Sequence, residues 1–318
     1  MKSTKLRSWT EALLGAGAVN APPHVFELSE TALRYARFES QKGSLAGRFF
    51  RQVELPEEIF QSGALGGPLR DAEAFERSLG ELLANLDVTV DRASLLLPDK
   101  WLRTVVVDMG ETPWRSDEEV LRWRLKKHVP FRVEDLRLQA VEVNGSGDGR
   151  VLVGFAIEQL VAGVESAFRK CGIRIGQVTN RSLATASAIS DVPELRSIVV
   201  LDDHCYSLVF AVARRAVMLR YKALDPKDLG DGLEAVIRQD LRITRGFIRQ
   251  ELPDQTLSRT LFCGPPSSEE AWLPLLEECL GAPTVRLGEE DLRPTAMPMA
   301  EPWHVMAPLL GAAGMEVR

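Results

Sequence analysis

The sequence predicts an α/β protein with two copies of a βββαβ unit and a small α/β subdomain inserted after the first copy. Two observations predict this fold class. Apolar runs of strand and helix periodicity occur twice in the same order, and a second pattern of helix, strand, turn and strand separates them. The predicted parts are a tail at 1–21, a first half at 22–100, an insert at 101–172, a return to the first half at 173–195, and a second half at 196–318.

The composition excludes several classes of protein. The chain has 39 lysines and arginines against 45 acids, a net charge of −6, so no general attraction to nucleic acid is expected. The four cysteines form no paired motif, which is typical of a reduced cytoplasmic protein. The histidines form no HExxH or HxxxH pattern, and no apolar run approaches the roughly 20 residues of a membrane span.

The N-terminal tail carries a weak helical pattern. Leu6, Trp9 and Leu13 recur at i, i+3 and i+7 among basic residues. Such a segment is either an amphipathic helix that docks on a membrane surface or a partner, or a frayed terminus.

The first half opens with three strands separated by polar turns, and a helix with apolar residues at Phe75, Leu79 and Leu82 follows. A short apolar strand, closed by a proline, completes the unit. The expected elements are strands at His24–Leu28, Leu33–Glu39 and Gly47–Leu55, a helix at Asp71–Leu86 and a strand at Ala93–Leu97.

The insert begins with a strand and an unusually well-marked helix. Ser116 and Glu119 form a capping box, acids precede bases along the helix, and Pro130-Phe131 ends it. On chemistry alone this is either an ordinary surface helix or a structural joint. The other expected elements are strands at Trp101–Met109, Leu136–Val143 and Arg150–Ile157 around the turn at 144–149, and a helix at Gln159–Lys170 with Gly172 as its C-terminal cap.

The second half repeats the order of the first. A strand at Ile173–Thr179 and a small-residue helix at Ser182–Ile189 lead into it. We expect a helical region at about 226–257 and two later helices, the first capped by Gly281. The expected elements are strands at Ser197–Leu201, Ser207–Val212, Val217–Leu224 and Thr260–Cys263, and helices at Asp228–Gln250, Ser267–Leu280 and His304–Gly314.

Two βββαβ units with inserted pieces resemble the duplicated ribonuclease-H-like core of actins, sugar kinases and Hsp70. Within the insert, residues Ser116–Leu136 resemble part of the small inserted subdomain of the PilM family. These are the cytoplasmic actin-like proteins of type IV pilus assembly, which are similar to FtsA. The element order matches from Pro23 onward and the motifs match across about 94–224. The matching residues are Glu118, Glu119, Trp123, Val129-Pro130-Phe131, Glu134 and Asp135.

The resemblance implies nucleotide loops, and three loops here depart from the family's pattern. The first reads Glu27-Leu28-Ser29-Glu30-Thr31 up to Arg34, where the family has Asp-Ile-Gly, small hydroxyl residues and a lysine. The second keeps Asp202 but loses its glycine, and the third reads Gly264-Pro265-Pro266. A side chain and a negative charge oppose phosphate there, so we expect no cofactor. The alternative is retained Mg-ATP, with Asp202 orienting a metal-bound water.

The resemblance also implies a scaffold that holds the N-terminal peptide of a PilN-like bitopic partner and contacts other platform proteins and an assembly ATPase, at the cytoplasmic side of the inner membrane. On this hypothesis Trp123, Leu125 and Phe131 build or support a groove. Arg122, Lys126 and Lys127 meet polar or acidic partner groups. The alternative is that the aromatic residues only fix the insert to the main body. The sequence leaves homo-oligomerisation open.

Two other functions are compatible with the predicted fold. An actin-like ATPase would need a catalytic carboxylate, for which Glu27, Asp202 and Asp203 are the candidates by position. The cytoplasmic domain of a type II secretion L protein has a related fold. Those chains carry a membrane segment after it, and none is readable here.

Overall fold

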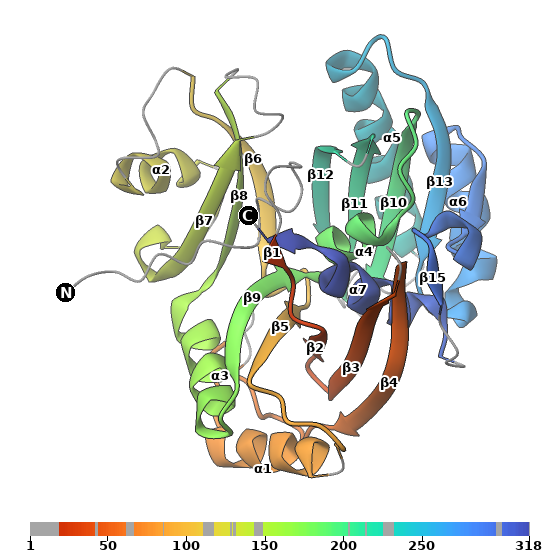
Figure 1. Ribbon diagram of the computed structural model, residues 1–318. Helices are drawn as coiled ribbons and strands as arrows, with labels where there is room; N and C mark the ends of the chain where they lie inside the picture. Colours follow the sequence, from red (N-terminus) through yellow and green to blue (C-terminus); the bar gives the residue numbers. More distant parts are fainter. Residues whose placement is uncertain are drawn as a thin grey trace.

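The computed structural model shows two sheet-containing halves with a small insert beside them (Figure 1). The tail at 1–18 and the predicted site residues Phe131 and Asp203 lie outside the described part of the chain. The described residues are 19–41, 44–61, 67–84, 86–110, 118–127, 129, 132–142, 149–202, 204–213, 215–224, 232–296 and 301–317.

The first half is a six-stranded sheet in the order β15-β4-β3-β2-β5-β9. β2, β3 and β4 form antiparallel hairpins, whereas β5 and β9 add in parallel because helices connect them to the preceding elements. The elements are β2 (His24–Leu28), β3 (Ala32–Gln41), β4 (Ser44–Glu54), α1 (Ala72–Leu83), β5 (Arg92–Leu97), α3 (Glu158–Lys170), β9 (Arg174–Asn180), α4 (Arg181–Ala188) and β15 (Thr295–Ala296).

The second half is a five-stranded sheet in the order β12-β11-β10-β13-β14. This repeats the order β4-β3-β2-β5-β9 of the first half, so the predicted duplicated βββαβ fold is confirmed. The elements are β10 (Leu195–Asp202), β11 (Cys205–Val212), β12 (Arg215–Ala223), α5 (Leu233–Glu251), β13 (Leu257–Cys263), α6 (Glu269–Leu280), β14 (Thr284–Arg286) and α7 (Trp303–Gly314).

Helices α4 and α7 lie between the two halves (Figure 1). Their small residues join apolar side chains of both sheets in one buried cluster. The two backbones touch: a Cβ placed on Gly311 would lie 1.7 Å from the carbonyl oxygen of Ala184, so only glycine fits there. Ser187 Oγ also donates to the Gly311 carbonyl at 2.8 Å. The halves are therefore joined by a close-packed helix pair.

The insert is a three-stranded sheet, in the order β6-β8-β7, that α2 covers on one side. Its core is separate from that of the main body, and Leu121 and Leu125 of α2 belong to it. The predicted insert at 101–172 also included α3, but the apolar face of α3 packs with α1 in the first half's core. The elements are β6 (Arg103–Asp108), α2 (Glu118–Leu125), β7 (Leu136–Glu142) and β8 (Arg150–Ile157).

Some short elements were not expected from the sequence. β15 lies in the proline-rich segment that was predicted as a connection, and it pairs with β4 at Leu45 and Ala46. β1 (Val19–Asn20) pairs with β16 (Glu316–Val317) and brings the two ends of the described chain together. Within the described residues, no helix is long and apolar enough to cross a membrane.

Candidate functional site

The first candidate site is a cleft of about 430 Å³ between the two halves, here called the interlobe cleft. The turn after β2, the end of β10, and the starts of α6 and α7 form its walls. Of the predicted cofactor residues, Ser29, Thr31, Arg34 and Asp202 line it. The fold thus brings two loops together that are far apart in the sequence.

Glu27 lies beneath this cleft, fully buried, and two arginines neutralise it. Arg34 Nη1 lies 3.0 Å from one carboxylate oxygen, and Arg181 Nη1 lies 2.6 Å from the other. Arg181 comes from the first turn of α4 and also donates to the His304 carbonyl at 3.0 Å. The triad therefore connects β2, β3, α4 and α7. Sequence reasoning missed Arg181, because nothing local relates it to Glu27.

The remaining predicted cofactor residues are engaged within the fold. Ser29 Oγ accepts from the Ala32 amide at 2.9 Å, which closes the turn on itself. Gly264 lines a neighbouring, smaller cavity. A Cβ on Gly264 would lie 2.5 Å from the Phe262 ring and 3.1 Å from Leu201, so side-chain packing by itself requires glycine there.

A buried carboxyl group that the sequence analysis missed, Asp99, also lies between the halves. Both its oxygens accept from Ser182, one from the hydroxyl and the other from the backbone amide at 3.1 Å. Burial raises the pKa of Asp99 to about 7, and the nearby Asp202 charge adds to the rise while the Ser182 hydrogen bonds oppose it. Burial likewise lowers the pKa of His304 to about 4, helped by Arg181.

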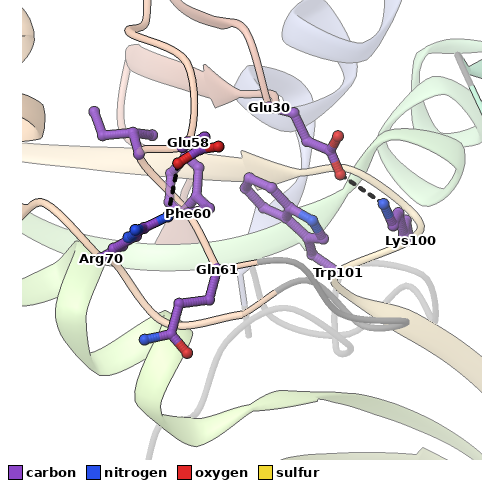
Figure 2. Close-up of a pocket in the computed structure, with 8 residues that line it drawn as sticks. Glu30, Glu58, Phe60, Gln61, Arg70, Lys100 and Trp101 are labelled. Atoms are coloured by element: carbon purple, nitrogen blue, oxygen red, sulfur yellow. Dashed lines mark hydrogen bonds and ion pairs between the residues drawn. The ribbon is translucent and has the colours of Figure 1, made fainter.

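The second candidate site is a cavity of about 520 Å³ on the first half, next to the start of β6 where the chain enters the insert. We call it the Trp101 cavity. Figure 2 shows Trp101 between two ion pairs, Glu30–Lys100 at 2.6 Å and Glu58–Arg70 at 2.7 Å. These charges come from the turn after β2, from the segments before and after residues 62–66, and from the turn after β5.

The apolar wall of this cavity contains an unmatched hydrogen-bond donor. Phe60 and Trp101 pack with ring centroids 4.6 Å apart. The indole nitrogen of Trp101 is buried and has no acceptor among the described residues. A buried donor without a partner costs about 1–3 kcal/mol. A ligand with a carbonyl group and an apolar side chain, as in an extended peptide, would match this wall.

The residues predicted to bind a partner lie on and after α2. Leu125 is fully buried in the insert's core, so it supports the helix and presents no surface. Arg122 is bonded to Glu118 and the Val133 carbonyl, and Lys126 pairs with Glu134 at 3.0 Å. None of them is among the residues that the structure places around the Trp101 cavity.

Trp123 differs from the other residues predicted on α2 because its side chain is 55% exposed. The Arg124 guanidinium and the Lys127 amine each lie 5.2 Å from the centre of its ring. The two cation–π contacts leave the ring more than half exposed and contribute only about 0.5–1 kcal/mol each at exposed sites. The structure brings Trp123 and Lys127 together but keeps both apart from the residues of the two cavities.

Solved structures share this architecture. The PilM–PilN type IV pilus biogenesis complex contains a chain with a TM-score of 0.71 at 18% identity, over 94% of this chain and 98% of that one. The cytoplasmic domain of EpsL, an inner-membrane component of the Vibrio cholerae type II secretion system, has a TM-score of 0.51 at 14% identity, over 91% and 93%.

A third structure is a Bacteroides thetaiotaomicron protein with an actin-like ATPase fold and unknown function, with a TM-score of 0.50 at 9% identity, over 90% of this chain and 94% of that one. No protein-family profile and no curated protein matches the sequence. The chain has an actin-like fold of the type seen in PilM, and the resemblance inferred from the insert is confirmed at the level of fold.

Proposed function

We propose that this chain is a non-enzymatic scaffold of a type IV pilus, or related secretion, assembly platform at the cytoplasmic face of the inner membrane. In this role it binds the N-terminal cytoplasmic peptide of a PilN-like membrane partner. Trp101, at the wall of this cavity, carries the proposal, because its buried indole donor has no acceptor among the described residues. The fold shared with the PilM of a PilM–PilN complex supports the choice of partner.

The Trp101 cavity suits a short extended peptide. Its aromatic wall can bury one or two apolar side chains, and the indole can donate to a peptide carbonyl. The two ion pairs at its sides hold charges that can also meet a peptide's polar groups. On this proposal the first half, next to the start of the insert, holds the peptide site, and Trp123 on α2 makes a different contact.

The interlobe cleft supports the absence of ATP turnover. The carboxylate at the position where the family's Asp would assist Mg²⁺ is Glu27, and both its oxygens are bonded to arginines. Ser29 turns its hydroxyl to its own loop, where a glycine would admit a phosphate. These residues do not fit a magnesium triphosphate, so no reaction step is assigned to them.

The proposal is tested by measuring how tightly the full chain binds the synthetic N-terminal peptide of its PilN-like partner. Trp101→Phe keeps an aromatic ring but removes the donor. We expect the dissociation constant to rise about tenfold, as the loss of one hydrogen bond of about 1–1.5 kcal/mol predicts. Trp123→Ala is the control and should leave the affinity unchanged. Equal affinity for the Trp101→Phe variant and the wild type, or a loss only in Trp123→Ala, would move the site to α2.

The alternatives make distinct predictions. A retained nucleotide site would bind Mg-ATP more tightly than about 100 μM in a calorimetric titration, about −5.5 kcal/mol, and that result would contradict the scaffold proposal. A type II secretion L-protein role is favoured by the likeness to the EpsL domain, but the TM-score of 0.51 against 0.71 supports the pilus assignment. Contacts with other platform proteins, an assembly ATPase or a second copy remain part of the proposal.

A further inference from the structure

The first half, the insert and the second half meet at a small polar cavity of about 10 Å³, here called the junction cavity. Asp99 lines it from the turn after β5, Arg103 from β6 of the insert, and Tyr221 from β12 of the second half. The Arg103 guanidinium lies 4.2 Å from the centre of the Tyr221 ring, and Arg150 of β8 donates to the Val217 carbonyl of β12 at 3.3 Å. Polar and aromatic contacts therefore hold the insert against the second half at this place.

Asp99 is the buried acid of this junction, and it forms no ion pair with a lysine or arginine of the described chain. Its residue is only 3% exposed, and both of its hydrogen bonds within the described residues come from Ser182 of α4. The nearby Arg181 and Arg220 each pair with another acid. A buried carboxylate without a cation partner is costly, so the closed junction favours the neutral form of Asp99.

Asp99 is also the group at this junction that changes charge near neutral pH. Burial, and then the charge of Asp202 at the end of β10, raise the pKa of Asp99 to about 7. Burial raises the pKa values of the nearby thiols and of the Tyr221 hydroxyl, so these stay neutral, and the arginines stay charged. The charged and titratable side chains around Asp99 are Arg103 (β6), Arg181 (α4), Asp202 (β10), Cys205 (β11), Arg220 and Tyr221 (β12) and Cys263 (β13).

The direction of the pH effect follows from these pKa values. In the closed junction Asp99 keeps its proton up to about pH 7, whereas a carboxyl group in water has a pKa of 3.8. Between these values, opening the junction releases the proton, so a rise in pH favours the open form until the pH passes 7. A charged Asp99 in the closed junction would also face the charge of Asp202 on the other half.

We propose that Asp99 is a proton-dependent switch between the two halves of the molecule. With its proton, Asp99 keeps the turn after β5 and strand β6 closed on β11 and β12. Without the proton, this contact opens. The same turn carries Lys100 and Trp101, so the switch borders the Trp101 cavity. The switch does not depend on which partner the chain binds.

Modification of the Cys205 thiol by an uncharged reagent, located by mass spectrometry, reports opening in the full chain. Cys205 begins β11, is 2% exposed, and faces Asp99 and Arg103. The wild-type rate is divided by the rate for Asp99→Asn at each pH, which cancels the thiol's own pH dependence. We expect this ratio to rise about tenfold between pH 6 and pH 8, mostly below pH 7, as the two pKa values of Asp99 predict.

Cys279 is the matched control, because it is 1% exposed in the second half's core on α6, where unfolding exposes it but opening of the junction does not. Ser182→Ala is the second variant. It removes a hydroxyl hydrogen bond that lowers the pKa of Asp99, so the rate ratio should level off at a higher pH. A flat ratio at Cys205, an equal rise at Cys279, or an unshifted profile in Ser182→Ala would each overturn the proposal.

Discussion

The interlobe cleft and the Trp101 cavity have similar volumes, about 430 and 520 Å³, but they satisfy their polar groups in opposite ways. In the cleft, buried Glu27 has an arginine on each oxygen, and the ion pairs link elements of the same chain. In the cavity, buried Trp101 has a donor with no acceptor among the described residues. Glu27 is neutralised by two arginines of the same chain, whereas the buried Trp101 indole has no acceptor among the residues that the structure describes.

This difference indicates where a change should affect stability and where it should affect binding. A buried charge whose partner is removed stays in the core without compensation. An unmatched donor that is removed leaves nothing behind inside the fold. Substitutions in the interlobe cleft should therefore lower the unfolding free energy. Substitutions at the Trp101 cavity should weaken ligand binding and change the unfolding free energy little.

The largest effect is expected for Glu27→Gln. Two arginines would lose their shared carboxylate, and breaking a buried pair costs about 3–5 kcal/mol of unfolding free energy. Urea denaturation measures the loss. Glu39→Gln is the control, since Glu39 is half exposed and its pairs with Arg37 and Arg48 contribute at most about 1 kcal/mol. Similar losses in the two variants would show that the Glu27 triad does not stabilise the joint between the halves.

Asp99 should make stability depend on pH. Its pKa is about 7 in the folded chain against 3.8 for the free group, so the folded state holds the proton that the unfolded state releases. The resulting stabilisation is complete below pH 3.8 and is lost as the pH rises through 7, by up to about 4 kcal/mol.

Asp99→Asn removes this titration, and the two proteins are compared by urea denaturation at pH 5 and pH 8. Relative to the variant, the wild type should be less stable at pH 8 than at pH 5. Asp71→Asn, at the exposed N-terminal cap of α1, is the control for general effects of losing a carboxylate. Parallel pH profiles for wild type and Asp99→Asn would contradict a proton held at Asp99.

At the Trp101 cavity, in contrast to the interlobe cleft, Trp101→Phe should change the unfolding free energy by less than about 1 kcal/mol. The smaller ring loses packing, but removal of an unmatched buried donor offsets that loss. Chemical denaturation gives the value. A loss of 3 kcal/mol or more would mean that the indole has an internal role in the fold.

The smallest effect is expected at Trp123. Its side chain is more than half exposed, so Trp123→Ala should change the unfolding free energy by no more than about 0.5 kcal/mol. Thermal unfolding measures this. Leu125→Ala, two residues further on in the insert's core, is the contrast and should cost about 2–5 kcal/mol. Comparable losses would mean that Trp123 packs on the insert rather than facing a partner.

Much of the fold was predictable because its elements have strong local patterns. The strand runs, the helix of α1 and the Gly281 cap, with φ of 75°, follow from periodicity and backbone chemistry. The two-residue strand β15 was not predictable, since its only support is a pairing with β4, which is 250 residues away at Thr295 and Leu45. The assignment of α3 to the insert was wrong for a similar reason. An amphipathic stripe shows that one face of a helix is buried, but it does not show which other element covers that face.

For the candidate sites, the sequence by itself determined which loops lose the nucleotide pattern, because Ser29, Glu30 and Pro265 are local departures that can be read directly. It also predicted an amphipathic helix in the insert, which the structure has as α2 with Leu121 and Leu125 buried, whereas the predicted capping residue Ser116 lies outside the described residues. Only the tertiary structure showed that an ion pair occupies the first of these loops. It brings Arg181 within 2.6 Å of Glu27, although the two residues are 154 positions apart in the sequence. It also decided that Leu125 is buried, that Trp123 is exposed, and that the Trp101 indole has no acceptor within the described part of the chain. Burial and partnership depend on which distant segments meet, and a local pattern carries no record of them.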